Sequence, residues 1–197
     1  MIILCSAIED EMEELSEHYD SDRFIKVNLG VGLINAAANL KAVLAEHGDE
    51  IEEVVFMGTA GSYRKNLKIG DVVQVQKAHL HTLGKLLDVA YTPTKVKPIN
   101  LTTITSEKMI TADCMSAMEI TNDDITAAKI YKNAGKEFLV ENMELFAVAQ
   151  IAEEHELRCR GILAVTNYCN IFADKEYEDN EDEVHGALCE FVDEMQL

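Results

Sequence analysis

Four short segments of the sequence combine side chains that can bind a ligand or move a proton with small or apolar neighbours. In the first, Glu9, Asp10 and Glu11 lie just after the strand-like run Ile2–Ser6. A carboxylate held at the turn between a strand and a helix can act as a general acid or base. Acidic residues also favour the first turn of any helix, because they complement its dipole. This segment therefore leaves a catalytic and a structural interpretation open.

The second segment is the small-residue turn from Gly58 to Ser62, which follows the apolar run Val54–Met57. Glycine has no Cβ, so a ligand can approach the backbone of such a turn closely. The hydroxyls of the turn, with the amides between them, form a concavity suited to an anion or a sugar. We therefore expect Thr59 and Gly61 to lie beside a ligand, although a plain tight turn has the same composition.

The third segment, Val140–Glu144, is the end of a strand running into a helix. Its carboxylates can accept hydrogen bonds from the two adjacent hydroxyls of a ribose, and Met143 can form a soft apolar floor beneath the sugar. The alternative is an acidic helix start of structural value alone. If the segment binds a sugar, Val140, Met143 and Glu144 are its substrate-binding residues.

In the fourth segment the apolar strand end Ala164–Val165 runs into the polar residues Thr166 and Asn167. Side chains that donate and accept hydrogen bonds can read the edge of a heterocyclic base. An asparagine that starts a turn has the same sequence pattern. Four strand ends with suitable chemistry are more specific together than any one alone, so Asn167 joins Glu11 as a candidate catalytic residue.

Short apolar runs alternate with helical patterns along the chain, which predicts a β-α-β-α order. Strands are expected at Ile2–Ser6, Phe24–Leu29, Val54–Met57, Val72–Gln76, Leu101–Ile104, Phe138–Val140 and Gly161–Val165. Helices are expected at Glu9–Glu17, Leu33–His47, Met143–Glu154 and Asp182–Gln196. A further helix is expected from the capping segment Thr121–Asp124 to about Asn133, with Gly135 as its C-cap. The run Tyr177–Glu183 is expected to be a solvated loop and helix start. This order predicts an α/β fold, a three-layer α/β/α sandwich with a central mixed sheet and ligands beyond the carboxyl ends of its strands.

Length and composition fit a single domain over residues 1–197, with a hydrophobic fraction of 48% and only two prolines. The formal net charge of −19 repels phosphate backbones and anionic membranes, so neither nucleic acid nor a membrane is an expected partner. No apolar run approaches the roughly 20 residues that a membrane helix needs. The five cysteines form no CxxC pair and favour reduced thiols in a cytoplasm.

His79 and His81 would project from one face of a strand and could bind a metal ion. No acid or cysteine stands at ligand spacing beside them. We therefore expect no metal and no cofactor.

In this order, the four segments resemble those of the nucleoside phosphorylase and nucleosidase superfamily. That family holds purine nucleoside phosphorylases, methylthioadenosine/adenosylhomocysteine nucleosidases and futalosine hydrolases. The resemblance spans most of the chain and includes Gly30–Gly32, Asn35–Ala37 and Leu67–Val73; its most specific parts are Leu67–Val73 and Met143–Glu144. It implies the fold of that family and cleavage of an N-glycosidic bond through an oxocarbenium-like sugar.

The resemblance also implies roles for individual residues. Glu144 corresponds to the glutamate that holds the ribose hydroxyls, and Met143 to the methionine beneath the sugar. Glu11 corresponds to the acid that orients and deprotonates water in the hydrolytic branch, a contribution of typically about 10² to 10⁴ in rate. Thr59 and Gly61 correspond to the turn beside the sugar or phosphate. The expected partner is a small purine nucleoside, joined by phosphate if the reaction is phosphorolysis.

One departure from the family pattern concerns the base. Adenine-specific nucleosidases carry an aspartate that protonates the purine N7, where this chain has Asn167. An asparagine can hydrogen-bond a base but cannot deliver a proton at neutral pH. Asparagine here is familiar in members that act on 6-oxopurines, including futalosine hydrolases. The implied substrate is a 6-oxopurine nucleoside or a futalosine-like derivative.

The sequence favours water over phosphate as the nucleophile. A phosphorylase needs arginines aimed at phosphate, whereas the first loop is acidic and the basic candidate near the third is Arg64. Arg23, Arg158, Arg160 or an arginine of a partner subunit could still fold into the site. Hydrolysis is the prediction, and a phosphate-dependent purine nucleoside phosphorylase or a nucleoside-binding protein without turnover are the alternatives.

A homodimer is the assembly that the resemblance implies. The stretch between Gln76 and Ser106 is shorter than usual in the family, and the helix Leu33–Leu44 is apolar. A second copy of the chain would then complete or cover the pocket.

Overall fold

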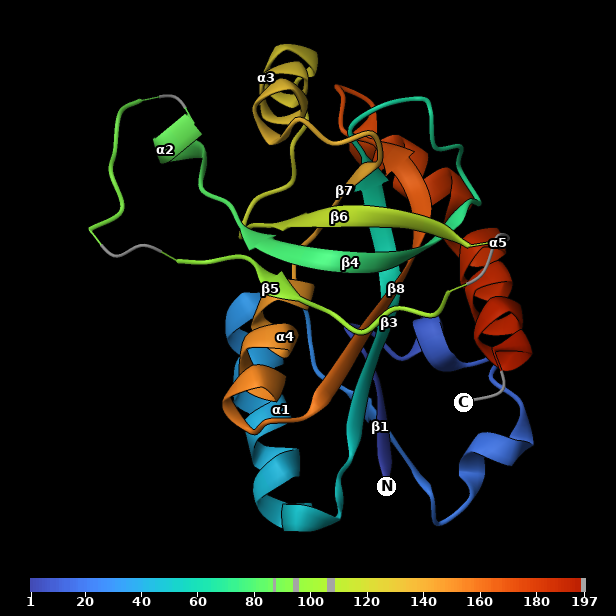
Figure 1. Ribbon diagram of the computed structural model, residues 1–197. Coiled ribbons are helices and arrows are strands. Elements are labelled where there is room, and N and C mark those ends of the chain that lie inside the picture. Colours follow the sequence, from blue (N-terminus) through green and yellow to red (C-terminus); the bar gives the residue numbers. More distant parts are fainter. Residues whose placement is uncertain (87, 94–95, 106–108, 196–197) are drawn as a thin grey trace.

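A mixed eight-stranded sheet forms the centre of the computed structural model, which describes residues 1–86, 88–93, 96–105 and 109–195. The strands follow the order β2-β1-β3-β7-β6-β4-β5, and β8 pairs with both β3 and β4. The sheet is strongly twisted, so that β3 and β8 cross β4 and β6 steeply (Figure 1). The strands are β1 (Ile2–Ser6), β2 (Phe24–Asn28), β3 (Glu53–Ser62), β4 (Val72–Leu80), β5 (Ile99–Asn100), β6 (Ile110–Ser116), β7 (Leu139–Asn142) and β8 (Arg158–Tyr168).

Helices cover both faces of this sheet. The helices α1 (Leu33–His47) and α4 (Leu145–Glu154) pack together on one face, and α5 (Ala173–Glu194) packs on the other (Figure 1). Successive side chains of β1 serve different layers, because Ile3 and Leu4 belong to separate apolar clusters. This double burial explains why the strand is continuously apolar. The α/β fold predicted from the sequence, with a central mixed sheet, is confirmed.

The structure describes five further helical segments. They are α2 (Leu83–Leu86), α3 (Asp124–Ala134) and the 3₁₀ turns η1 (Asp10–Met12), η2 (Glu17–Asp20) and η3 (Gly48–Glu50). Both ends of α3 have the caps expected from the sequence. The side chain of Asp123 accepts the N–H of Thr126 at 2.7 Å, and Gly135 takes the left-handed conformation with φ of 62°.

The helix expected over Glu9–Glu17 is wrong, since only the turns η1 and η2 lie in this part of the chain. In the turn η1 the Glu11 Oε2 accepts the backbone N–H groups of Ala7 and Ile8 at 3.0 and 3.3 Å, which ties this turn to the end of β1.

The strand expected at Leu101–Ile104 is also wrong. Strand pairing ends at Asn100, and the N–H of Ile104 donates to the side chain of Gln74 rather than to a neighbouring strand.

The strand β6 lies further along the chain and was not expected, because Asp113 interrupts its apolar pattern. The charge of Asp113 is balanced by Lys136, whose Nζ lies 3.1 Å from Oδ2. The sequence alone does not reveal that Lys136 will lie beside Asp113 and allow its carboxylate to be buried.

The helix α5 begins at Ala173, so the acidic run Tyr177–Glu183 is helical and not the loop that was expected. Apart from Ala173, the buried side chains of α5 begin at Val184. The first turns of this helix therefore have no apolar periodicity by which the sequence could reveal them. An ion pair of 2.6 Å between Lys175 and Asp179 spans one exposed turn there. The predicted end at Gln196 lies outside the described residues.

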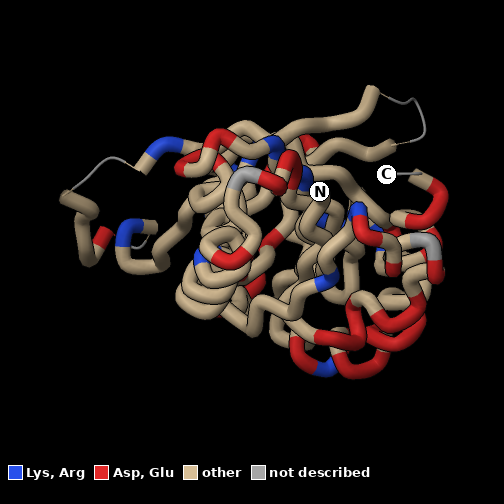
Figure 2. Tube along the Cα trace, turned by 90° about the horizontal axis from the view of Figure 1, so that it is seen from below, with Lys and Arg blue, Asp and Glu red and all other residues tan. Residues whose placement is uncertain are grey.

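Acidic residues dominate the charge of the molecule, with 36 Asp and Glu against 17 Lys and Arg, and they recur along much of the trace (Figure 2). Among the helices that the structure describes, none is both long and apolar enough to cross a membrane. The five cysteines are all buried and free of disulfides.

Candidate active site

A cavity of about 440 Å³ lies where β1, β3, β7 and β8 end. The strand β3 continues through the small-residue segment and β8 continues to Tyr168, so Thr59, Gly61 and Asn167 lie in strands rather than in turns. The cavity brings together all the site residues expected from the sequence except Val140, which is fully buried in the core. Its lining residues are Ala7, Ile8, Glu11, Val31, Thr59, Ala60, Gly61, Ile120, Glu141, Asn142, Met143, Glu144, Thr166, Asn167, Asp174, Tyr177 and Glu178.

Glu11 is held in one orientation against β3. Its Oε1 accepts the backbone N–H of Thr59 at 2.9 Å and the Thr59 hydroxyl at 3.1 Å. A Cβ at Gly58 would lie 3.1 Å from the same oxygen, which explains the glycine. Burial raises the pKa of Glu11, although backbone hydrogen bonds, that of Thr59 foremost, lower it. A fixed carboxylate with raised proton affinity is suited to take a proton from water.

Glu144 precedes α4, and its Oε1 accepts the backbone N–H of Gly32 at 2.7 Å. Gly32 has a φ of 90°, which residues with a side chain rarely adopt, so glycine is needed to present this N–H. Burial raises the pKa of Glu144 to about 7; the hydrogen bond from Gly32 lowers it and the charge of Glu11 raises it further. The two carboxylates therefore act on each other within one cavity.

Asn142 fixes the turn that carries Met143 and Glu144. Its Oδ1 accepts the N–H groups of Glu144 and Leu145, both at 2.8 Å, which fixes the turn that leads into α4. Its Nδ2 donates to the carbonyl of Thr59 at 3.1 Å, which ties the turn to β3. Met143 is half-buried and lines the cavity between them. The sugar-binding segment predicted from the sequence is thus anchored to the strand that carries Thr59.

Asn167 lies beside Gly61, its partner in the neighbouring strand, next to a register shift between Ala60 and Gly61. Its Oδ1 accepts the hydroxyl of Thr166 at 2.9 Å, and its Nδ2 donates to the carbonyl of Tyr168 at 3.3 Å. A Cβ at Gly61 would lie 3.1 Å from the Asn167 Nδ2. The amide therefore packs closely over Gly61, where an added side chain would have to displace Asn167 or Cys169.

The cavity is strongly acidic. The carboxylates that line it belong to Glu11, Glu141, Glu144, Asp174 and Glu178, and none of the described lining residues is a lysine or arginine. Such a lining stabilises positive charge that develops on a bound sugar. It also repels phosphate and other anions.

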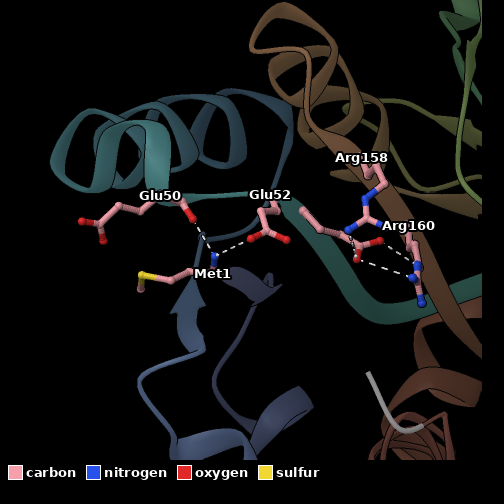
Figure 3. Close-up of polar contacts among 6 residues, drawn as sticks. Met1, Glu50, Glu52, Arg158 and Arg160 are labelled. Atoms are coloured by element: carbon pink, nitrogen blue, oxygen red, sulfur yellow. Dashed lines mark hydrogen bonds and ion pairs between the residues drawn. The ribbon is translucent and has the colours of Figure 1, made fainter.

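Two of the arginines that could have served a phosphate lie at the far end of β3 and β8 from the cavity. Arg160 Nε is 2.7 Å from Glu53 Oε1, and Arg158 Nη2 is 3.6 Å from Glu53 Oε2 (Figure 3). Glu53 is only 2% exposed, so these arginines balance a buried charge. The N-terminal amine of Met1 lies in the same region (Figure 3).

The other two arginines are engaged with aromatic rings. The Arg64 guanidinium lies 4.5 Å from the centre of the Tyr131 ring, beside a smaller hollow of about 200 Å³. The Arg23 guanidinium lies 5.4 Å from the centre of the Phe24 ring. Both contacts are of the cation–π type. None of the four arginines, all of which lie in described parts of the chain, therefore lines the candidate active site.

Several cavity residues have no role in the sequence analysis. Glu141 stands within a segment that was singled out, but nothing in the sequence shows where its side chain points. Tyr177 and Glu178 fall in the run that was expected to be a solvated loop and helix start, and Asp174 lies just before it. Their spacing of three and four residues, which places them on one helix face, is the signal that could have found them. Nothing in the sequence indicates Ile120.

A second hollow, of about 640 Å³, lies between α2 and α3 and is lined by His79 and His81. His79 does not pair with His81, because its Nε2 lies 2.8 Å from Asp113 Oδ2. In the described parts of the chain, no group of three or more His, Cys, Asp or Glu side chains is arranged to hold a metal ion. Of the three hollows lined by described residues, the first is the one that brings two or more glutamates together.

The family model of the phosphorylase superfamily matches residues 2–195, so the chain belongs to the phosphorylase superfamily. The resemblance drawn from the four segments is thereby confirmed. No curated protein shows significant sequence similarity to the chain.

Solved structures share the fold over its full length. The 5'-methylthioadenosine/S-adenosylhomocysteine nucleosidase of Helicobacter pylori matches with a TM-score of 0.82 at 15% identity, covering 99% of this chain and 97% of that one. The corresponding Neisseria meningitidis enzyme, in complex with methylthio-immucillin-A, matches with a TM-score of 0.81 at 20% identity, covering 99% and 97%. The futalosine hydrolase of Helicobacter pylori matches with a TM-score of 0.81 at 15% identity, covering 99% and 96%. At these identities the similarity concerns the fold.

Proposed function

We propose that the protein hydrolyses the N-glycosidic bond of a purine nucleoside, with water as the nucleophile. Family membership and the fold shared with nucleosidases support a nucleosidase or nucleoside phosphorylase. The observation that supports hydrolysis is that Glu11 and Glu144 line the same carboxylate-rich cavity, while the arginines contact Glu53 or aromatic rings outside it. This environment favours neutral water over anionic phosphate.

The proposed reaction begins with the sugar over Met143, its hydroxyls donating hydrogen bonds to Glu144. The bond between C1′ and the base nitrogen breaks, and its electron pair leaves with the base. The ribose becomes cation-like, and the carboxylates of Glu11 and Glu144 stabilise that charge. Water attacks C1′ and gives a proton to Glu11, which yields free ribose. The departing base takes up a proton from solvent.

Asn167 supports a 6-oxopurine nucleoside, or a futalosine-like derivative, as the substrate. Its Nδ2 can donate a hydrogen bond to the base but cannot transfer a proton. A 6-oxopurine needs less help to leave than adenine, because its exocyclic oxygen can carry part of the negative charge. A fixed hydrogen-bond donor is then sufficient assistance.

We also propose that the enzyme works as a homodimer. Val31, Met118 and Ile120 are each about half exposed, at 51%, 49% and 51%, and Val31 and Ile120 line the cavity. Apolar side chains around an open ligand site are suited to cover by a second copy of the chain. The free, buried cysteines support a reducing, cytoplasmic location.

The function is tested by measuring release of the free base from inosine, adenosine, methylthioadenosine and futalosine, each with and without phosphate. Hydrolysis predicts release that is independent of phosphate and fastest with inosine or futalosine. A rate that requires phosphate would select the phosphorylase. Binding of a nucleoside without release of base from any of the four would leave a binding protein without turnover.

A further inference from the structure

His185 is a buried imidazole of α5 that the proposed reaction does not use. Its exposed fraction is 6%, and it is not among the residues that line the cavity. Within the described parts of the chain, its Nε2 has no hydrogen-bond partner. A buried polar atom without a partner is costly and uncommon, so a histidine at this position needs an explanation.

The helix α5 packs against η1, the turn that carries Glu11. Cys189 lies one turn after His185 on the same helix face, and its Sγ donates a hydrogen bond to the Glu11 carbonyl at 3.4 Å. A Cβ at Gly186 would lie 2.8 Å from Glu14 Oε2, so the helix closely contacts the residues that follow the turn. The imidazole therefore lies on the helix face that packs against the segment of Glu11, outside the lining of the cavity.

Glu11 is a buried carboxylate whose hydrogen bonds bring no positive charge. It is 3% exposed, and its donors are the N–H groups of Ala7, Ile8 and Thr59 and the Thr59 hydroxyl, all of them neutral. Burial raises the pKa of Glu11, while the backbone hydrogen bonds, that of Thr59 foremost, lower it, and so does positive charge on His185. His185 is therefore placed to balance the charge of this carboxylate.

Most ionisable side chains around His185 are acidic. Those within two turns of it on α5, or on the segment that faces it, are Glu11, Glu14, Tyr177, Glu178, Glu181, Asp182 and Cys189. The strands beneath the helix contribute apolar side chains, such as Met57, Val72 and Ile162, to the cluster that holds Val184 and Leu188. Lys175, the other basic residue of α5, is paired with Asp179. These surroundings stabilise a positive charge on the imidazole.

We propose that His185 is a positioning residue for the hydrolysis: its imidazolium keeps Glu11 ionised, so that this carboxylate can take a proton from water near neutral pH. The inference rests on the proposed function, which makes Glu11 the base. A neutral side chain in place of His185 would leave Glu11 protonated up to a higher pH, and a protonated carboxyl cannot act as a base. His185 contacts neither substrate nor water in this scheme and acts through Glu11.

The titration of Glu11 tests this inference without turnover. Carbon-13 NMR of the side-chain carboxyls follows it, and the Glu11 signal is assigned by its absence in Glu11→Gln. We expect the pKa of Glu11 to rise by about 0.5 to 1 pH unit in His185→Gln, which removes the charge. The matched control Cys189→Ala alters the same contact between α5 and η1 without removing a charge, and should leave the pKa of Glu11 unchanged. An unchanged titration in His185→Gln, or an equal rise in Cys189→Ala, would overturn the proposal.

The dependence of kcat/KM on pH gives a second readout that a merely structural role would not move. With inosine as substrate, the acidic limb of the profile reports the base of the free enzyme. We expect this limb to move to higher pH by about 0.5 to 1 pH unit in His185→Gln, with a smaller change at the plateau. A rate lowered equally at every pH would assign His185 a structural role and refute the proposal.

The variant His185→Leu is made alongside, because it replaces an unpartnered buried ring by an apolar side chain within an apolar cluster. It should show the same rise in the pKa of Glu11 and fold at least as stably as wild type, measured by circular dichroism melting. Loss of folding in both variants would make the residue structural and refute the inference. A shifted Glu11 titration without base release from any nucleoside would support this inference and refute the proposed hydrolysis. Base release with an unshifted titration would do the reverse.

Discussion

Glu11 and Glu144 reach the same cavity from segments far apart in the chain, and the charge on Glu11 raises the pKa of Glu144. Each carboxylate is also fixed by a backbone N–H, from Thr59 and Gly32 respectively. A cation-like ribose placed between them would relieve their mutual repulsion. The pair is thus better matched to the charged sugar of a transition state than to a neutral nucleoside.

We expect Glu144→Ala to lower kcat for base release by about 10²- to 10³-fold, because its hydrogen bonds to the ribose hydroxyls strengthen as charge develops. Steady-state kinetics with inosine measures this. Glu144→Gln is the control for size and should also be slow. Unchanged kcat with only a raised KM would show that Glu144 binds the ground state and the transition state equally.

Glu11→Gln should leave nucleoside binding within a few-fold of wild type and lower hydrolysis by about 10² to 10⁴, since an amide cannot accept the proton of water. Calorimetry gives the affinity and single-turnover kinetics gives the chemical step. Wild-type rates in this variant would remove Glu11 from the mechanism.

The stability of the protein should depend on pH through Glu144. Its pKa is raised from the ordinary value of 4.5 to about 7 in the folded state, so the folded state binds more protons between these values. Stability contributed by this group is complete below about pH 4.5 and is lost as the pH rises to about 7. Glu144→Gln should gain about 1 to 3 kcal/mol relative to wild type between pH 5 and pH 8, measured by urea unfolding. A constant difference at both pH values would contradict the raised pKa.

Asn167→Asp should shift the preference toward 6-aminopurine nucleosides. A carboxylic acid at this position can transfer a proton to the base, which adenine needs more than hypoxanthine does. We expect the ratio of kcat/KM for adenosine over inosine to rise by about tenfold or more. Asn167→Ala, which removes the donor altogether, should be slow with both nucleosides, and a fall in both for the aspartate variant as well would argue against this role.

Met118→Glu should shift the protein from dimer to monomer, because it places a charge among the exposed apolar residues beside the cavity. Light scattering coupled to gel filtration at micromolar concentration measures the change. A wild-type protein that is already monomeric would refute the dimer.

The parts of the fold that the sequence predicted are those whose interactions are local or uniform. The run Val54–Met57 is buried on both faces and is apolar throughout, so it was recognisable. The helix α1 has a regular periodicity, and its predicted bounds Leu33–His47 agree with the structure. The features that the sequence did not predict, such as β6, depend on distant partners like Lys136 beside Asp113. No local pattern reports such a partner.

The candidate site divides in the same way. Glu11 and Glu144 were singled out because carboxylates at strand ends are a local signal, and the family resemblance gave them roles. The position of Glu141 between Thr121 and Tyr63 depends on strand pairing, which only the structure provides. Val140 belongs to a segment whose other residues line the cavity, but the alternation of β7 directs it into the core.

The groups proposed to hold the sugar and those proposed to face the base are anchored independently. Asn142 fixes Glu144 through the turn before α4, whereas Asn167 is fixed by Thr166 within β8. We therefore expect a substitution at the end of β8 to leave the turn before α4 in place. In evolutionary terms, single substitutions at the end of β8 could then change which base the site accepts. The residues proposed to break the glycosidic bond would stay unchanged, so new base specificities would be reached in few steps.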